Sequence, residues 1–199
     1  MLPRSFYFLR HGETDWNKEG RLQGHVDIPL NETGRNQARL SIPILQKYPI
    51  DRIISSPLSR ALETAQIVNE LLQKPLIIDE RLRERHFGLY EGKTGPEIDQ
   101  WKAENPGLIL PIDPETGLTS PPGGETYQQL RDRVFQLKNE ILTMHQDESI
   151  LFVAHGGVYQ LLFSALAQKA GQQMTKSPNA KPFHFVRNGP LEWELLHLE

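Results

Sequence analysis

Two histidines in this sequence stand where a buried strand is expected to end. An apolar and aromatic run over Phe6–Leu9 leads directly to Arg10 and His11, and a second apolar run over Ile150–Ala154 leads to His155. An imidazole nitrogen is a competent nucleophile, and a guanidinium group binds phosphate oxygens through paired hydrogen bonds. A lone histidine of this kind is more often structural than catalytic. Two of them, each followed by a glycine that lets a ligand or another backbone approach closely, predict a reactive site.

Two further charged side chains follow shorter apolar runs. Arg60 comes after Arg52–Ile54, in the first turn of an expected helix, and Glu84 comes after Leu76–Ile78. Because reactive groups in open α/β sheets lie just past the carboxyl ends of the strands, we expect all of these side chains to share one crevice. Two histidines, two arginines and a carboxylate are suited to phosphoryl transfer.

A zinc site is the competing interpretation of the same residues, and it fits less well. The charge of two arginines would oppose a cation, and none of the seven histidines is paired in a His-x-x-x-His or comparable ligand spacing. The sequence also contains no glycine-rich nucleotide loop of the Walker or dinucleotide type and no Gly-x-Ser-x-Gly elbow. We therefore expect no metal and no cofactor.

Strand and helix patterns alternate along the chain. A helix is expected from an Asn31 cap toward Gln46, ending early or kinking at Pro43. A second helix is expected to begin with Ser56 as its cap and Pro57 at its first position. Two more helices are predicted over Tyr127–Met144 and Val158–Ala170, and a strand that alternates apolar and acidic residues over Leu191–Leu195.

This order of elements predicts an α/β fold. We expect a three-layer α/β/α sandwich with a mostly parallel sheet and one antiparallel edge strand, formed by the last strand of the chain. No internal repeat or second composition block is visible, so a single domain over residues 1–199 is expected.

Three irregular segments are predicted between these elements. Arg21–Leu30 is expected to be a loop, and Gly171–Lys181 a polar and mobile surface loop. Glu104–Gly124 is rich in proline and glycine, and so long an irregular segment within a compact fold is usually functional, so we expect it to cover the site as a lid. The choice of substrate is expected to depend on this segment and on the nearby Tyr90 and Trp101.

The composition fits a soluble globular protein with a slight negative charge. A formal net charge of -3 argues against nucleic acid or an anionic membrane surface as the main partner. The absence of cysteine excludes disulfides, thiolate catalysis and Cys-ligated zinc, and it fits a reducing compartment. Too few apolar residues precede Arg10 for a signal peptide or a membrane span. We therefore expect a cytoplasmic monomer or homodimer with no nucleic-acid or membrane partner.

Several segments together carry a family pattern that covers nearly the whole chain. They are Arg-His-Gly-Glu-Thr-x-Trp-Asn at 10–17, Ser-Ser-Pro-Leu-Ser-Arg-Ala at 55–61, Leu-x-Glu-x-x-x-Gly-x-x-Glu-Gly at 82–92, Pro-x-Gly-Glu-Thr at 122–126 and Ala-His-Gly-Gly-Val at 154–158. This pattern resembles the motifs of the histidine phosphatase superfamily, the phosphoglycerate mutase-like enzymes.

The resemblance implies a role for each of the main candidates. His11 is implied to be the nucleophile that becomes phosphohistidine, and Arg10, Arg60 and His155 to grip the phosphoryl group. Glu84 is implied to protonate the leaving oxygen and then to activate water. The resemblance also implies that Asn17, Gln23 and Gly24 lie near the phosphoryl group. Together with Gly156, which adjoins His155, they are the weaker phosphate- or substrate-binding candidates.

This assignment sets a protonation state for three groups in the reaction. His11 must be neutral to attack, whereas His155 would serve better protonated, as a charge partner for phosphoryl oxygens. Glu84 must carry a proton in order to act as a general acid.

The reaction expected is hydrolysis of a small phosphorylated metabolite, with inorganic phosphate as a product. A phosphoglycerate mutase is the nearest alternative, and a non-catalytic binding protein on the same fold is the second. The segment Glu91-Gly92-Lys93-Thr94 is closer to the phosphatases of the family, and its mutases tend to be longer. Gln160 stands where many relatives have arginine, which puts a secondary anion contact in doubt.

Overall fold

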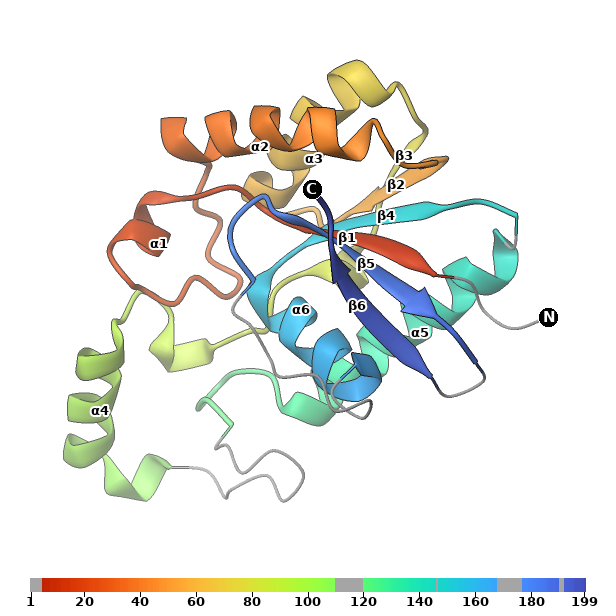
Figure 1. Ribbon diagram of the computed structural model, residues 1–199. Coiled ribbons are helices and arrows are strands. Elements are labelled where there is room, and N and C mark those ends of the chain that lie inside the picture. The colour runs from red at the N-terminus through yellow and green to blue at the C-terminus, as the bar shows by residue number, and fades with distance from the viewer. Residues whose placement is uncertain (1–4, 110–119, 146, 168–176, 190–191) are drawn as a thin grey trace.

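The computed structural model describes residues 5–109, 120–145, 147–167, 177–189 and 192–199, and these form a six-stranded sheet between two layers of helices (Figure 1). The sheet has the order β3-β2-β4-β1-β5-β6, in which the first four strands run parallel. The strands are β1 (Phe6–Arg10), β2 (Arg52–Ser55), β3 (Leu76–Ile78), β4 (Ile150–Ala154), β5 (Pro182–Arg187) and β6 (Trp193–His197). The predicted α/β fold with a mostly parallel sheet is therefore confirmed.

The C-terminal part of the sheet holds a strand that the sequence analysis did not predict. β5 pairs antiparallel with β1, and β6 pairs antiparallel with β5 at the edge of the sheet. In β5, Phe183 and Phe185 are buried while His184 between them is half-buried, which is the period-2 pattern of a strand. This pattern is short, begins at Pro182 and directly follows a polar stretch, so it was overlooked.

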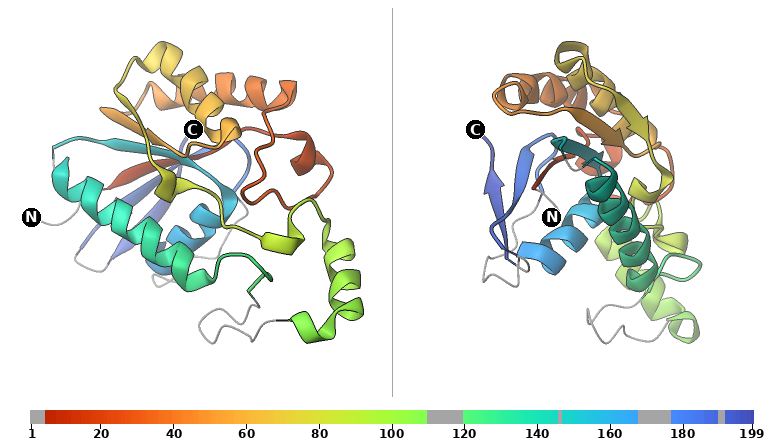
Figure 2. Two further views of the ribbon diagram at one scale, coloured as in Figure 1. Left: turned by 180° about the vertical axis from the view of Figure 1, so that it is seen from behind. Right: turned by 90° about the vertical axis from the view of Figure 1, so that its right-hand side faces the viewer.

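Helices cover both faces of the sheet, as predicted. α2 (Glu32–Leu45) and α3 (Ser59–Leu72) lie on one face, and α5 (Tyr127–Met144) and α6 (Gly156–Leu162) lie on the other. The right-hand view of Figure 2 shows the sheet between these two layers. α6 continues as a π-helical turn over Phe163–Ala167, and the end of the helix predicted to reach Ala170 lies outside the described residues.

The core follows from the alternation of side chains along the central strands. In β1, Phe6 and Phe8 pack in the layer that contains α5 and α6, whereas Tyr7 and Leu9 pack in the layer that contains α2 and α3. A strand that is apolar on both sides is the expected centre of a parallel sheet. The carboxyl end of β1 is thereby fixed in the middle of the fold.

Two helices were predicted with explicit caps, and one of them begins elsewhere. α3 begins at Ser59 with Leu58 as its cap, not at Pro57 with Ser56 as its cap. The Ser56 hydroxyl accepts from the amide of Leu58, the residue before the helix, at 3.3 Å, and it lies 2.8 Å from a ring nitrogen of His155. In contrast, α2 begins after Asn31, the predicted cap. It does not end early at Pro43, because the helix continues through this proline to Leu45.

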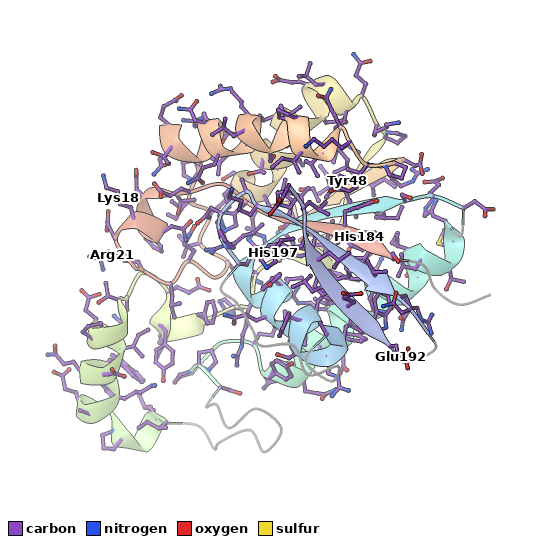
Figure 3. All side chains as sticks on the ribbon, in the orientation of Figure 1. Lys18, Arg21, Tyr48, His184, Glu192 and His197 are labelled. Atoms are coloured by element: carbon purple, nitrogen blue, oxygen red, sulfur yellow. The ribbon has the colours of Figure 1, made fainter. Side chains whose placement is uncertain are left out.

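α1 (Asp15–Lys18) and α4 (Gly95–Glu104) lie together at one end of the molecule (Figure 1). α4 was not predicted, although Thr94 and Glu97 form a capping box at its start, a pattern that is visible in the sequence. Arg21, labelled in Figure 3, joins the segment after α1 to the residues before α4. It pairs with Thr94 in a β-bridge, and its Nη1 donates to the Gly92 carbonyl at 2.7 Å.

The predicted lid over Glu104–Gly124 is described only in part, because residues 110–119 lie outside the described residues. Its first residues end α4 and form a 3₁₀ turn over Pro106–Leu108. Its last residues pack on the segment after Glu84, where the Leu89 amide donates to the Pro122 carbonyl at 3.0 Å. The residue that follows the predicted lid, Glu125, donates its amide to the His86 carbonyl at 2.8 Å.

The predicted mobile surface loop over Gly171–Lys181 needs a correction in its described half. Residues 171–176 lie outside the described residues, but Ser177 and Ala180 are buried. The Ala180 amide donates to the Arg10 carbonyl at 3.0 Å. This half of the segment is thus fixed against the end of β1.

Candidate active site

The two histidines meet because β1 and β4 are adjacent parallel strands in register. Arg10 pairs with Ala154, and the amide of His11 donates to the Ala154 carbonyl at 2.9 Å. The ring centroids of His11 and His155 lie 5.2 Å apart, and both side chains are buried. The two histidines therefore lie side by side at this edge of the sheet, as predicted.

The local backbone sets which nitrogen of His11 is free. Nδ1 lies 2.6 Å from the Gly12 carbonyl oxygen, and a carbonyl can only accept, so Nδ1 carries the proton. Nε2 of the neutral ring consequently keeps a lone pair. Gly12 itself has no room for a side chain, because a Cβ there would lie 2.3 Å from the Gly34 carbonyl oxygen at the start of α2. The close approach expected beside His11 is thus made by another backbone.

His155 is held through the residue that follows β2. Its Nε2 lies 2.8 Å from the Ser56 hydroxyl, while its Nδ1 is buried with no hydrogen-bond partner in the described part of the chain. Ser56 was missed as a site residue because its position before a proline suggested a helix cap.

Arg60 is fully buried, and loop carbonyls orient its guanidinium group. Nη2 donates to the Gly24 carbonyl at 2.7 Å and Nη1 to the Val26 carbonyl at 2.9 Å, whereas no described residue accepts from Nε. Gly24 has a φ of +53°, and a Cβ there would lie 1.9 Å from Glu91 Oε1. The described contacts of Gly24 are therefore with Arg60 and Glu91, and they explain why a glycine occupies this position.

The segment over residues 177–180 holds Arg10 and the backbone of His11. Nη1 of Arg10 donates to the Ser177 carbonyl at 2.6 Å, and Asn179 Nδ2 donates to the His11 carbonyl at 2.9 Å. Nε of Arg10 is buried with no partner among the described residues. Sequence reasoning missed Ser177 and Asn179 because they lie in a polar segment with no periodic pattern.

The carboxylate of Glu84 lies at the amino end of α6. Both of its oxygens accept from the Gly157 amide at 3.0 Å, and Oε1 also accepts from the Arg85 amide at 2.8 Å. A Cβ on Gly157 would lie 2.3 Å from Oε1, so only glycine leaves this space. Glu84 is attracted electrostatically to both Arg10 and Arg60. The structure thus brings all five main candidates together.

The surroundings keep both histidines neutral. Burial, followed by the charges of Arg10 and Arg60, holds the pKa of His11 well below its usual value. Burial, followed by Arg60, holds the pKa of His155 well below its usual value too. The neutral state expected of His11 is present. The protonated state expected of His155 concerns a bound phosphoryl group; without that anion, burial and the charge of Arg60 favour the neutral ring.

The weaker candidates lie around this group with different contacts. Asn17 Oδ1 accepts from Asn179 Nδ2 at 3.3 Å and from the Thr14 amide at 3.2 Å. The side chain of Gln23 is 7% exposed, and its Oε1 has no partner in the described part of the chain. Asn17 is therefore linked to the His11 carbonyl through Asn179, whereas Gln23 is buried with an unused acceptor.

Gly156 and Gln160 lie on α6 with opposite surroundings. A Cβ on Gly156 would lie 3.7 Å from Arg10 Cζ and 3.9 Å from Glu84 Oε2, so this glycine adjoins two of the main candidates. Gln160 is exposed on the helix surface.

Tyr90 and Trp101, predicted to affect the choice of substrate, contact each other edge to face with ring centroids 5.5 Å apart.

Within the described ranges, no three His, Cys, Asp or Glu side chains are grouped so that they could hold a metal ion. The positive charge next to the histidines comes from Arg10 and Arg60, and the Nε of each is buried without a described partner. None of the described helices is long and apolar enough to cross a membrane.

Comparison with known proteins gives one family for nearly the whole chain. The model of the histidine phosphatase superfamily (branch 1) matches residues 6–184. The chain is 36% identical over 173 residues to glucosyl-3-phosphoglycerate phosphatase of Mycolicibacterium vanbaalenii, which covers 83% of this chain and 75% of that protein. It is 38% identical over 157 residues to phosphoglycerate mutase-like protein 4 of Arabidopsis thaliana, covering 78% and 67%.

The fold has close counterparts among solved structures. Bacillus stearothermophilus YhfR superposes with a TM-score of 0.80 at 31% identity, covering 97% of this chain and 95% of that one.

Proposed function

The chain belongs to the histidine phosphatase superfamily (branch 1) and is an enzyme of that family, and we propose that it hydrolyses phosphate monoesters through a phosphohistidine on His11. The substrate is a small phosphorylated metabolite, and inorganic phosphate is the product. The relative from Mycolicibacterium vanbaalenii, whose name gives a sugar-linked phosphoglycerate as its substrate, supports this substrate class.

The observation that carries the proposal is the state of the His11 ring. Its Nδ1 proton is bound by the Gly12 carbonyl, so Nε2 is left as a nucleophile in a neutral imidazole. Around it, Arg10 Nε, Arg60 Nε and His155 Nδ1 have no hydrogen-bond partner among the described residues. Buried polar nitrogens are normally satisfied, and a phosphoryl group supplies oxygen acceptors for the two arginine Nε atoms and for His155 Nδ1 when that nitrogen carries a proton.

In the first step, His11 Nε2 attacks the phosphorus atom. A nitrogen–phosphorus bond forms, the bond between phosphorus and the ester oxygen breaks, and Glu84 gives its proton to the departing oxygen. The arginines stabilise the negative charge of the transferring group. His155 is neutral while the pocket lacks an anion, and the charge of a bound phosphoryl group favours its protonation.

In the second step, water attacks the phosphorus atom of the phosphohistidine. Glu84, now a carboxylate, takes a proton from that water, the nitrogen–phosphorus bond breaks, and inorganic phosphate leaves. Arginine and histidine supply all the positive charge in this scheme, so the reaction is proposed to be independent of metal ions.

Trapping of the phosphoenzyme tests the proposal. Wild-type protein mixed with a ³²P-labelled sugar phosphate in the presence of a strong chelator, then quenched in alkali, should carry acid-labile label on His11. His11→Ala should carry no label and release no phosphate while melting near the wild-type temperature, and His197→Ala, at an exposed position of β6, should behave as the wild type. Label on another residue, or turnover that requires added zinc or magnesium, would contradict the proposal.

Phosphoglycerate mutase activity is the second candidate, because several relatives are named as probable mutases or as mutase-like. The same phosphohistidine could return its phosphoryl group to another hydroxyl. With 3-phosphoglycerate as substrate, the phosphatase proposal expects free phosphate to form faster than 2-phosphoglycerate. The opposite order, especially after priming with 2,3-bisphosphoglycerate, would make the enzyme a mutase.

A further inference from the structure

Arg133 of α5 uses all five of its N–H donors on the short segment that carries Glu84 and on the Glu125 carboxylate beside it. Nη1 donates to the carbonyls of Arg81 and Arg83, both at 2.7 Å, and Nη2 donates to the carbonyl of Glu84 at 2.9 Å. Nε and Nη2 also bind the two oxygens of the Glu125 carboxylate, at 2.6 and 2.8 Å. An arginine presents these donors in a rigid plane, so the carbonyls it binds are fixed relative to one another.

Glu125 extends this contact to the far side of the same segment. Its amide donates to the His86 carbonyl at 2.8 Å, and its own carbonyl accepts from Arg85 Nε at 3.0 Å. The side chains of Arg133 and Glu125 are only 18% and 13% exposed. A largely buried ion pair with directional bonds is far better ordered than an exposed one.

The carbonyl of Glu84 receives a second donor from another part of the chain. His25 Nε2 lies 2.9 Å from it, and since a carbonyl can only accept, His25 donates. The main chain of Glu84 is therefore held by α5 on one side and by the loop that orients Arg60 on the other. Its carboxylate, by contrast, accepts from the amides of Arg85 and Gly157.

We propose that Arg133 is a positioning residue for the reaction, which acts by fixing the main chain from which Glu84 delivers its proton. This inference rests on the proposed function of Glu84 as the general acid. Arg133 makes no described hydrogen bond to the histidines or to Arg10, and its charge is the smallest of the named influences that lower the pKa of His155. Its five hydrogen bonds go to the segment of Glu84 and to Glu125, so its main effect on turnover is proposed to pass through Glu84. Misplacement of a proton donor by about 1 Å can reduce a rate by roughly 10²-fold.

The test compares two leaving groups in a double-mutant cycle. A proton donor matters most when the departing oxygen is strongly basic, so Glu84→Gln should slow an alkyl phosphate by roughly 10²–10⁴-fold and p-nitrophenyl phosphate far less. Arg133→Gln should show the same preference with a loss of up to roughly 10²-fold on the alkyl phosphate. In the Glu84→Gln background, Arg133→Gln should add no further loss, because the group it positions is already absent.

Two more variants keep the result interpretable. Arg83→Gln removes an arginine from the same segment that pairs with the exposed Glu80, and it should leave both rates near the wild-type values. Glu125→Gln keeps Arg133 but weakens its paired hydrogen bonds to the side chain at position 125. It should reduce the rate less than Arg133→Gln does, and again more for alkyl phosphates than for p-nitrophenyl phosphate. It carries the test if Arg133→Gln does not fold.

The outcomes separate this inference from the proposed function. A wild-type protein without phosphatase activity, or a Glu84→Gln variant with equal losses on both substrates, would overturn the function proposed for Glu84 and this inference with it. If Glu84→Gln behaves as expected but Arg133→Gln and Glu125→Gln slow both substrates equally, or add their loss to that of Glu84→Gln, only the positioning role is refuted.

Discussion

At the scale of single residues, the reactivity proposed for His11 depends on neighbouring groups that do not take part in bond making or breaking. The Gly12 carbonyl selects the tautomer, and burial together with Arg10 and Arg60 keeps the ring neutral. A neutral imidazole with its proton on Nδ1 is the form that can attack through Nε2. The cationic pocket that would bind a phosphoryl group therefore also prevents protonation of the nucleophile before substrate arrives.

A titration should reveal this coupling in the ligand-free protein. Because the folded pKa of His11 is lowered from 6.5, the ring stays neutral as the pH falls through that value and protonates only at lower pH. The NMR shift of the His11 ring Cε1 proton should accordingly show no step near pH 6.5. Arg10→Gln, which removes a positive neighbour, should move the step to higher pH, and Arg39→Gln on α2 should not. A titration step of His11 at its ordinary pKa in the wild type would show that burial and the two arginines do not keep the ring neutral.

At the scale of elements, the amino end of α6 brings two glycines to the site in different ways. Gly156 adjoins Arg10 and Glu84 at ordinary contact distances, whereas Gly157 touches the Glu84 carboxylate. Both lie in the first turn of the helix, and alanine is favoured over glycine in helices by up to about 1 kcal/mol. An alanine at either position should therefore change the stability of the helix by nearly the same amount. The two variants differ mainly in how closely the new methyl group approaches the Glu84 carboxylate.

Gly157→Ala should reduce turnover much more than Gly156→Ala. The new methyl group at position 157 would lie 2.3 Å from Glu84 Oε1 and must displace that carboxylate, and a displacement of about 1 Å can cost roughly 10²-fold in rate. Initial rates on an alkyl phosphate, with melting temperatures beside them, measure the difference. Equal rates for the two variants would show that the position of the Glu84 carboxylate does not limit the reaction.

At the scale of the whole molecule, Lys138 is a buried charge that the proposed reaction does not use. Lys138 of α5 is 6% exposed, and its amine lies 5.1 Å from the ring centroid of Phe135 and 5.8 Å from that of Trp193. Burial, followed by the nearby charge of Arg187, lowers the pKa of Lys138 from 10.5 to about 8. The folded state thus disfavours the charged amine relative to the unfolded chain.

This shift makes the stability of the fold depend on pH in a defined window. Between about pH 8 and 10.5, Lys138 binds a proton in the unfolded chain and not in the folded chain. Its contribution to the free energy of unfolding therefore rises with pH in this range and is constant at lower pH. At pH 7, Lys138→Met should raise the free energy of unfolding by at most about 3.5 kcal/mol, because the pKa falls from 10.5 to about 8 and each pH unit is worth about 1.4 kcal/mol. At pH 10.5 the gain should be small.

Urea unfolding of Lys138→Met and wild type at both pH values measures this difference. Lys47→Met, at an exposed position after α2, is the matched control and should give no pH-dependent change. A variant that is equally less stable at both pH values would show that the lysine contributes through packing and not through its charge.

Much of the fold could be predicted because it depends on local patterns. Apolar runs located β1 to β4, and helical spacing located α2, α3 and α5, since burial on a sheet imposes a period of two or near four on any sequence. β5 and α4 were missed, the first because its run is short and begins at a proline, and the second although its capping box was present. The single domain and the proposed roles of the site residues stay predictions.

The sequence by itself determined which groups would meet: His11, His155, Arg60 and Glu84 follow strands, and parallel strands place their carboxyl ends at one edge. Only the tertiary structure decided how each group is held. The Gly24 and Val26 carbonyls that orient Arg60, the Ser177 carbonyl that binds Arg10, and the contact of Arg133 with Glu84 join segments far apart in the chain. Backbone carbonyls are present at every residue and carry no sequence signature, so which of them face a given arginine depends on the folded path of the chain.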